Sequence, residues 1–130
     1  MILISKEFPQ HQFAWKVLGA VLGQTGRKPE AVDANQTAVA LSPQDAEAHS
    51  NLGVTLKELG RLDEAIDSFK TAYQINPNLD IETAFVEAYL RNEDPDNALP
   101  LLEKFLKKYP QDARANAYKT IALQIGRAHV

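Results

Sequence analysis

The segment that decides the fold is Ala46–Pro77, AEAHSNLGVTLKELGRLDEAIDSFKTAYQINP. Its apolar residues recur at the spacing of two helices that each have one apolar face. These residues are Leu52, Leu56 and Leu59 in the first helix and Ala65, Ile66, Phe69, Ala72 and Tyr73 in the second. Gly60 stands between them and, having no Cβ atom, can end the first helix in the left-handed conformation at no steric cost. The segment therefore predicts a helical hairpin.

The hairpin pattern recurs along the chain. Pro9, Pro43, Pro77 and Pro110 are 34, 34 and 33 residues apart. Shorter motifs keep the same period: Leu18-Gly19 returns as Leu52-Gly53, Gly26-Arg27 as Gly60-Arg61, and Glu30-Ala31 as Glu64-Ala65. A fixed period of this size indicates a stack of similar units, each of which buries its apolar face against its neighbours.

The repeat resembles the tetratricopeptide repeat, whose pattern is Trp, Leu-Gly and Tyr in a first helix, then Ala, Phe, Ala and Pro. The first repeat fills these slots with Trp15, Leu18-Gly19, Leu22, Ala31, Asn35, Ala38 and Pro43. The second has His49, Leu52-Gly53, Leu56, Ala65, Phe69, Ala72 and Pro77. The third has Glu82, Phe85-Val86, Tyr89, Ala98, Leu102, Phe105 and Pro110.

The resemblance implies an all-α fold, an α-α superhelix (solenoid) of antiparallel helix pairs. It divides the chain into repeats at 12–45, 46–78 and 79–111, followed by the first helix of a fourth unit at 112–124. We expect helices near 11–24, 28–40, 45–59, 63–75, 79–92, 95–108 and 112–125. Pro100 falls inside one of them, which should bend or start late. Asn35 fills an aromatic slot, and if buried it needs a partner or costs ~1–3 kcal/mol.

Both ends of the chain are interpreted as cut. Residues 1–9 have the spacing of the tail of a preceding repeat, the alternative being a natural capping helix. Ile125–Val130 is the in-frame translation of a common sequencing adapter, so we interpret it as artificial, the alternative being chance. Beyond Ile125 we expect a frayed end. The last helix should leave Tyr118, Ile121 and Ala122 partly uncovered.

The composition of the chain excludes several classes of function. The chain has 130 residues, a formal net charge of −3 and no cysteine, which excludes disulfides and thiolate metal sites. It lacks the basic stripe of nucleic-acid binders, and its apolar runs are too short to span a membrane. Without a signal-peptide leader, we expect a cytoplasmic protein. His11, His49 and His129 have no metal-ligand spacing, and no nucleophile or phosphate motif is present. The sequence therefore predicts no catalytic residue, cofactor or metal, and no enzyme.

The family resemblance implies a concave groove lined by the first helix of each repeat. The groove residues would be Phe13, Lys16, Ala20, Glu47, Ser50, Asn51, Val54, Lys57, Thr83, Glu87 and Arg91. Lys16 and Asn51 match the subtype that grips a C-terminal carboxylate, but Asp80 and Ala84 stand where that subtype has basic residues. A carboxylate clamp is therefore not expected.

The predicted function is a non-catalytic scaffold that binds a peptide or protein segment in this groove. The alternative is the N-terminal repeat region of a multidomain enzyme whose catalytic domain is missing from this chain. Residues 112–123 resemble the run before a 2-oxoglutarate/iron oxygenase domain in some bacterial repeat proteins. A glycosyltransferase or sulfotransferase domain is a comparable alternative.

Overall fold

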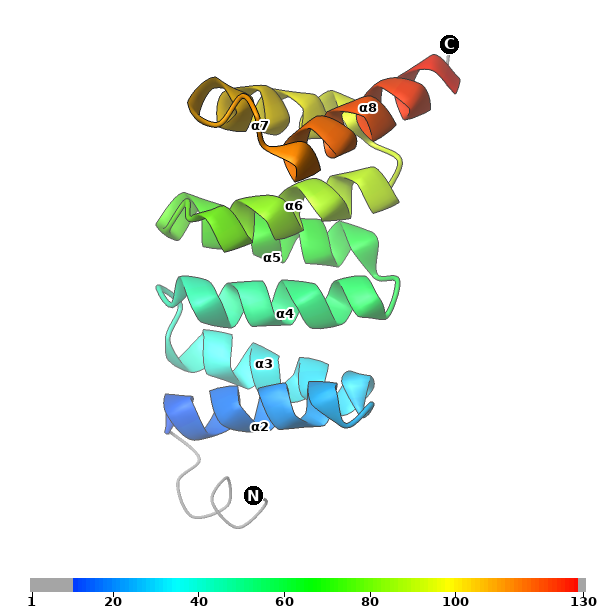
Figure 1. The fold of residues 1–130 in the computed structure, drawn as a ribbon. Helices are drawn as coiled ribbons and strands as arrows, with labels where there is room; N and C mark the ends of the chain where they lie inside the picture. The colour runs from blue at the N-terminus through cyan, green and yellow to red at the C-terminus, as the bar shows by residue number, and fades with distance from the viewer. Residues whose placement is uncertain (1–10, 129–130) are drawn as a thin grey trace.

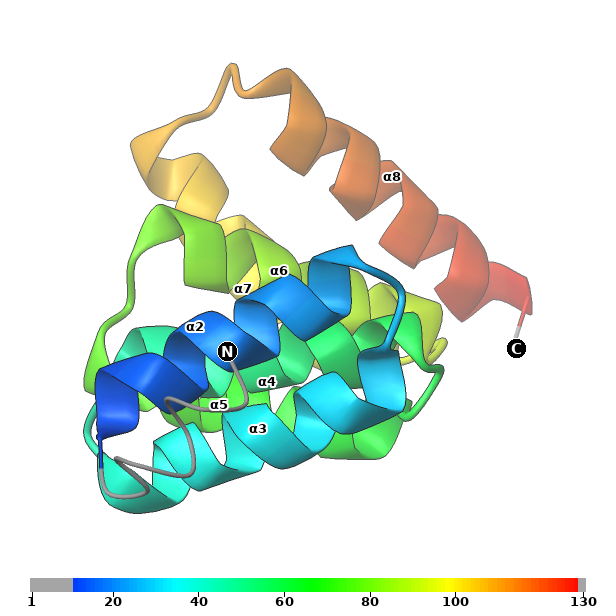
Figure 2. The same cartoon turned by 90° about the horizontal axis from the view of Figure 1, so that it is seen from below.

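The structure is a computed structural model that describes residues 11–128, which form α-helices and no β-strand. The helices are α2 (Gln12–Gln24), α3 (Lys28–Leu41), α4 (Ala46–Glu58), α5 (Leu62–Ile75), α6 (Leu79–Arg91), α7 (Pro95–Lys108) and α8 (Ala113–Ala128). They stack in chain order as successive helix pairs (Figure 1). Viewed along the stack, the axis of α8 is turned well away from that of α2 (Figure 2). The predicted all-α superhelix of helix pairs is confirmed.

Short polar side chains and glycines set the ends of the helices. Asp45 Oδ1 accepts the Ala48 N–H at 3.2 Å at the start of α4, and Asn78 Oδ1 accepts the Ile81 N–H at 2.9 Å at the start of α6. Such caps satisfy backbone donors that have no partner within the helix. Gly60 follows α4 with a φ of 79°, as the sequence predicts.

The core is centred on Phe69, which is completely buried in α5. A Cβ atom on Gly53 would lie only 2.8 Å from Phe69 Cε1, so α4 and α5 approach closely because residue 53 has no side chain. The Phe69 ring belongs to a cluster that also holds Leu56 of α4 and Phe85 of α6. One aromatic side chain therefore joins the second repeat to the third.

In the first repeat, Asn35 takes the place that Phe69 has in the second. It is 2% exposed, and its Nδ2 donates to Thr55 Oγ1 of α4 at 3.2 Å. Thr55 Oγ1 in turn donates to the Asn51 carbonyl at 3.1 Å. The side chain of Asn35 also fills the space beside Gly19, where a Cβ atom on residue 19 would lie only 2.0 Å from Asn35 Oδ1. The buried amide thus has the partner that the sequence analysis requires of it.

Two expectations about local structure need correction. Helix α7 does not start late, because Asp94 caps it at Pro95 and Pro100 lies inside it on an exposed face. Helix α8 runs to Ala128 rather than fraying after Ile125, since Ile125 packs against the cluster around Val86 and Leu102.

The exposure of α8 was predicted only in part. Ile121 is 42% exposed and Tyr118 is half-buried, but Ala122 is completely buried. It packs with Val86 and Ala98, so its small side chain faces the helices before it. The predicted tail of a preceding repeat at residues 1–9 lies outside the described residues.

Replacing Phe69 with Ala should lower the free energy of unfolding by ~3–5 kcal/mol, because it empties the joint between the second and third repeats. Urea unfolding followed by circular dichroism measures this change. Lys70→Ala, on the exposed side of the same helix, should change stability by less than ~0.5 kcal/mol. A loss below ~1 kcal/mol for Phe69→Ala would contradict the central role of this ring.

Glu93→Gly should stabilise the protein by ~1 kcal/mol. Glu93 ends α6 with a φ of 52°, whereas the corresponding turns use Gly26 and Gly60, with φ of 82° and 79°. An L-residue pays a steric cost in this region that glycine does not. Thermal unfolding measures the gain, and Gly60→Ala is the matched control that should shift stability in the opposite direction. An unchanged or lower melting temperature for Glu93→Gly would contradict the prediction.

Candidate functional site

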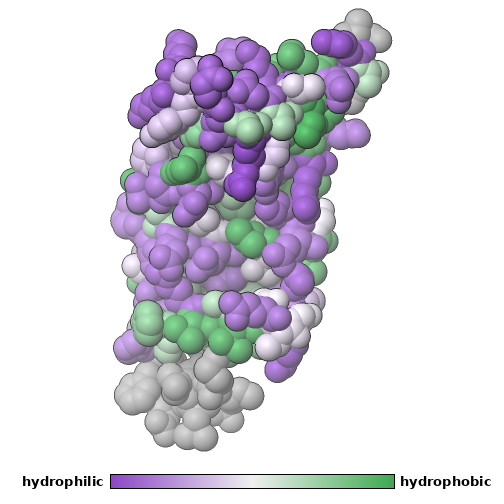
Figure 3. Space-filling view, viewed as in Figure 1, coloured by the Kyte–Doolittle hydropathy of each residue, from purple (hydrophilic) through white to green (hydrophobic). Residues whose placement is uncertain are grey.

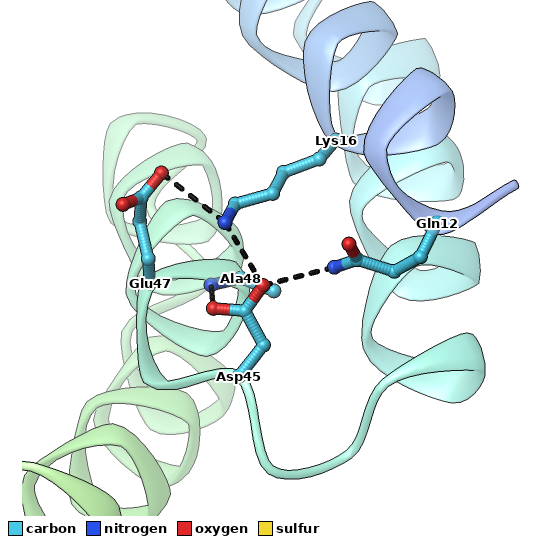
Figure 4. A network of polar contacts seen from close by, with 5 residues as sticks. All are labelled: Gln12, Lys16, Asp45, Glu47 and Ala48. Carbon is cyan, nitrogen blue, oxygen red and sulfur yellow. Dashed lines mark hydrogen bonds and ion pairs between the residues drawn. The ribbon is translucent and has the colours of Figure 1, made fainter.

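Polar contacts join the first helix of each repeat to the first helix of the next. Lys16 of α2 reaches the start of α4 (Figure 4). Its Nζ is 2.9 Å from Asp45 Oδ2 and 3.3 Å from Glu47 Oε1. Gln12 Nε2 donates to the same Asp45 oxygen at 3.0 Å. Asp45 therefore both caps α4 and holds α2 against it.

The pKa shifts of this pair follow from its contacts. Burial lowers the pKa of Lys16, but hydrogen bonds to Asp45 and Glu47 outweigh that effect and raise it above its ordinary value. Burial raises the pKa of Asp45, but hydrogen bonds from Lys16 and from the Ala48 N–H outweigh that effect and lower it. Both groups stay charged at neutral pH, and each neutralises the other.

A second set of contacts joins α4, α6 and α8. Lys57 Nζ lies 3.2 Å from Glu87 Oε2, and the Tyr118 hydroxyl donates to the other Glu87 oxygen. Burial, together with the Glu87 carboxylate, raises the pKa of Tyr118 to about 12. The Lys57 side chain is only 11% exposed, and its Nζ is 6.0 Å from the centroid of the Phe69 ring. Both groove lysines are thus paired with carboxylates of the chain itself.

Two cavities that open to solvent lie along the first helices, and one second helix also lines each of them. The smaller, of about 250 Å³, is lined by α2, α3 and α4 and includes the groove residues Ala20, Asn51 and Val54. The larger, of about 540 Å³, is lined by α6, α7 and the start of α8 and includes the groove residues Thr83 and Glu87. The volume of the larger cavity falls within the range of about 300–1,000 Å³ that is typical of ligand pockets, and the volume of the smaller cavity lies just below it.

The other groove residues are distributed along the stack. Phe13 is 65% exposed on α2, in line with the exposed apolar residues Val17 and Val21. Figure 3 shows the apolar band that lies over α2 on an otherwise largely hydrophilic face. Ser50 is half-buried on α4, and Arg91 is exposed at the end of α6. The eleven groove residues therefore do not form one continuous pocket.

The sequence analysis missed three residues that shape this surface: Asp45, Glu82 and Tyr118. Glu82 lines the larger cavity, and its Oε1 atom is shielded from solvent without a hydrogen-bond partner among the described residues. The signal for it was available, because Glu82 fills the slot that Trp15 and His49 fill in the earlier repeats. For Tyr118 the sequence holds no such signal, because the spacing of the repeats does not indicate that its hydroxyl donates a hydrogen bond to Glu87.

Residues 11–128 contain neither a metal-binding cluster nor a membrane-spanning helix. No group of three or more His, Cys, Asp or Glu side chains in this range is placed to hold a metal ion. No helix in the same range has the length and apolar character needed to cross a membrane.

Family models match most of the described helices. A model described as "TPR repeat" matches residues 19–60, and two described as "Tetratricopeptide repeat" match residues 46–79 and 83–123. No curated protein sequence matches the chain at a significant level.

Solved structures with the same fold include three for which the similarity extends over most of this chain. A structure of MamA protein has a TM-score of 0.85 at 22% identity and covers 95% of the chain. YrrB, described as a TPR protein with an unusual peptide-binding site, has a TM-score of 0.78 at 19% identity over 92% of the chain. A MamA structure labelled AMB-1 has a TM-score of 0.68 at 32% identity over 77%. The chain spans 68%, 62% and 59% of these proteins, respectively.

Glu82→Gln should stabilise the protein more at about pH 7 than at about pH 4. Burial raises the pKa of Glu82, while Lys104 and Lys108 oppose the shift. A raised pKa in the folded state means that the stability present with a protonated Glu82 is lost as the pH rises through that pKa. The amide avoids this loss. Urea unfolding at both pH values measures the difference.

Glu103→Gln is the matched control for this experiment. It removes the same charge from an exposed position on α7. Its effect on stability should be small and should not follow the pH dependence of Glu82→Gln. A Glu82→Gln variant that is less stable than the parent at neutral pH would show that the charged carboxylate is favourable where it lies.

Proposed function

Because the chain belongs to the tetratricopeptide repeat family, we propose that it is a non-catalytic scaffold that binds a peptide or protein segment. The segment lies in the groove lined by α2, α4, α6 and α8. The observation that carries the proposal is the pair of cavities on these helices, of about 250 and 540 Å³, which five of the groove residues line. YrrB, which shares the fold, is described as having a peptide-binding site.

The centre of the groove offers the polar and apolar contacts that an extended segment needs. Asn51 and Val54 lie on α4 and line the smaller cavity. The side-chain amide of Asn51 has no hydrogen bond to any residue in the range 11–128, so its donors and acceptor are free for a ligand backbone. Val54 supplies apolar area beside it and is half-buried.

The ends of the groove differ in character. At α2 the exposed Phe13 gives a large apolar contact, of the kind that dominates binding energy in interfaces. Toward α6 and α8 the surface is acidic and indented. The bound segment is therefore expected to place an apolar side chain at the α2 end of the groove. At the α6–α8 end it should place a side chain that complements an acidic surface.

Val54→Arg should weaken binding of groove ligands by about tenfold or more. The probes are synthetic copies of peptides selected from a displayed library of random short peptides, and fluorescence anisotropy measures their affinity. The arginine fills part of the cavity beside Asn51 and blocks it. Gln74→Arg adds the same side chain to an exposed position on α5, and it should leave the affinity unchanged.

Melting temperatures of both variants establish that they are folded. Equal loss of affinity in the two variants would place the binding surface elsewhere. Failure of the library to yield any saturable ligand would contradict the proposed function.

A further inference from the structure

The cavity between α6, α7 and α8 lies where the third repeat departs from the residue sizes of the earlier repeats. Glu82 stands where the earlier repeats have Trp15 and His49, so a slender side chain fills a slot made for a ring. The third repeat also has Val86 at the position of Gly53, and Phe105 at the position of Ala72. A pocket of about 540 Å³ that opens to solvent lies at this end of the stack.

The charges that line this cavity are mostly negative. Asp80, Glu82, Glu87 and Asp112 line it, against one base, Arg114. Glu87 is already paired with Lys57 and Tyr118, and Asp112 caps α8 by accepting the Ala115 N–H at 2.8 Å. The carboxylates of Asp80 and Glu82 accept no hydrogen bond from residues 11–128.

The neighbouring lysines do not satisfy Glu82. Lys104 and Lys108 of α7 are close enough to lower its pKa, against the larger effect of burial. Neither donates a hydrogen bond to it, and Lys104 Nζ instead donates to the Tyr73 hydroxyl at 3.3 Å. The partly buried Glu82 carboxylate therefore has no hydrogen-bond partner among residues 11–128, and a charged donor that enters the cavity would give it one.

The rest of the lining is apolar. Val86 and Leu102 are buried at the base, Phe105 is half-buried beside them, and Leu79 is 55% exposed at the rim. An aliphatic stem can pack on such a surface while a charged head reaches the carboxylate. Arginine suits this arrangement better than lysine, because its guanidinium group is more weakly hydrated and presents several donors in one plane.

We propose that this cavity binds an arginine side chain of the segment held in the groove, with the guanidinium group on Glu82 and the stem against Val86, Leu102 and Phe105. The inference rests on the proposed function, and it names the chemistry of the partner. The groove lysine nearest to this cavity, Lys57, is already paired with Glu87 and does not compete for Glu82.

The test uses the peptides selected from the displayed library on the full chain. Arginine should be enriched among them, and replacing that arginine with citrulline, its uncharged isostere, should weaken binding by about tenfold or more. Glu82→Gln should reduce the difference between the arginine and citrulline peptides to less than about threefold. Glu103→Gln, which removes an exposed carboxylate from α7, should leave the difference unchanged.

A second variant separates loss of binding from loss of folding. Glu82→Trp restores the ring that the slot holds in the first repeat, so it should raise the melting temperature while abolishing the preference for arginine. Peptides that bind equally well with citrulline, or to Glu82→Trp, would overturn the inference and leave the scaffold function intact. A library that yields no ligand would overturn both. Free arginine that competes at the same concentration as the peptide would show a small-molecule site and would also overturn the inference.

Discussion

The stack depends on how closely the two helices of a repeat approach each other. In the second repeat this approach is the contact of the Phe69 ring with Gly53, where any side chain on residue 53 would clash. The ring then reaches Phe85 of the next repeat, and so the same contact fixes both the pair and its neighbour. In the third repeat both of these slots hold larger residues, with Val86 in place of the glycine and Phe105 in place of an alanine. The close approach is lost there, and a cavity lies between α6, α7 and α8.

Much of the fold could be predicted because it depends on spacing. The period of the prolines and the Leu-Gly pairs gave the helices to within a few residues, and the left-handed turn at Gly60 followed from residue type. The left-handed Glu93 could not be predicted in this way. There the chain geometry of the repeat overrides the preference of a single residue. Likewise the burial of Ala122 depends on where α7 and α8 cross, which spacing alone does not determine.

The candidate site was less predictable than the fold. Membership of a first helix identifies Lys16 and Lys57, but only their distances to Asp45 and Glu87 reveal that both are neutralised. A pattern of residue types does not distinguish a lysine that is available to bind a ligand from one that forms an ion pair between two helices. For Glu82 the pattern did contain the information, since it departs from the ring found in two other repeats. In this chain the residue that departs from the repeat, Glu82, lines the larger cavity, whereas Lys16 and Lys57 are paired within the chain.

The hydrogen bond between Asn35 and Thr55 has a consequence for the order of assembly. Repeats with nearly equal interfaces can stack in the wrong sequence or exchange between molecules. At the position of Thr55 the third repeat has Ala88, which offers an amide no partner. Asn35 placed against α6 would be buried and unsatisfied, whereas Phe69 is accommodated there by Phe85 and Ala88. The polar pair thus favours packing of the first repeat against the second over packing against any other repeat. A single buried asparagine sets the register of a coiled coil in the same way.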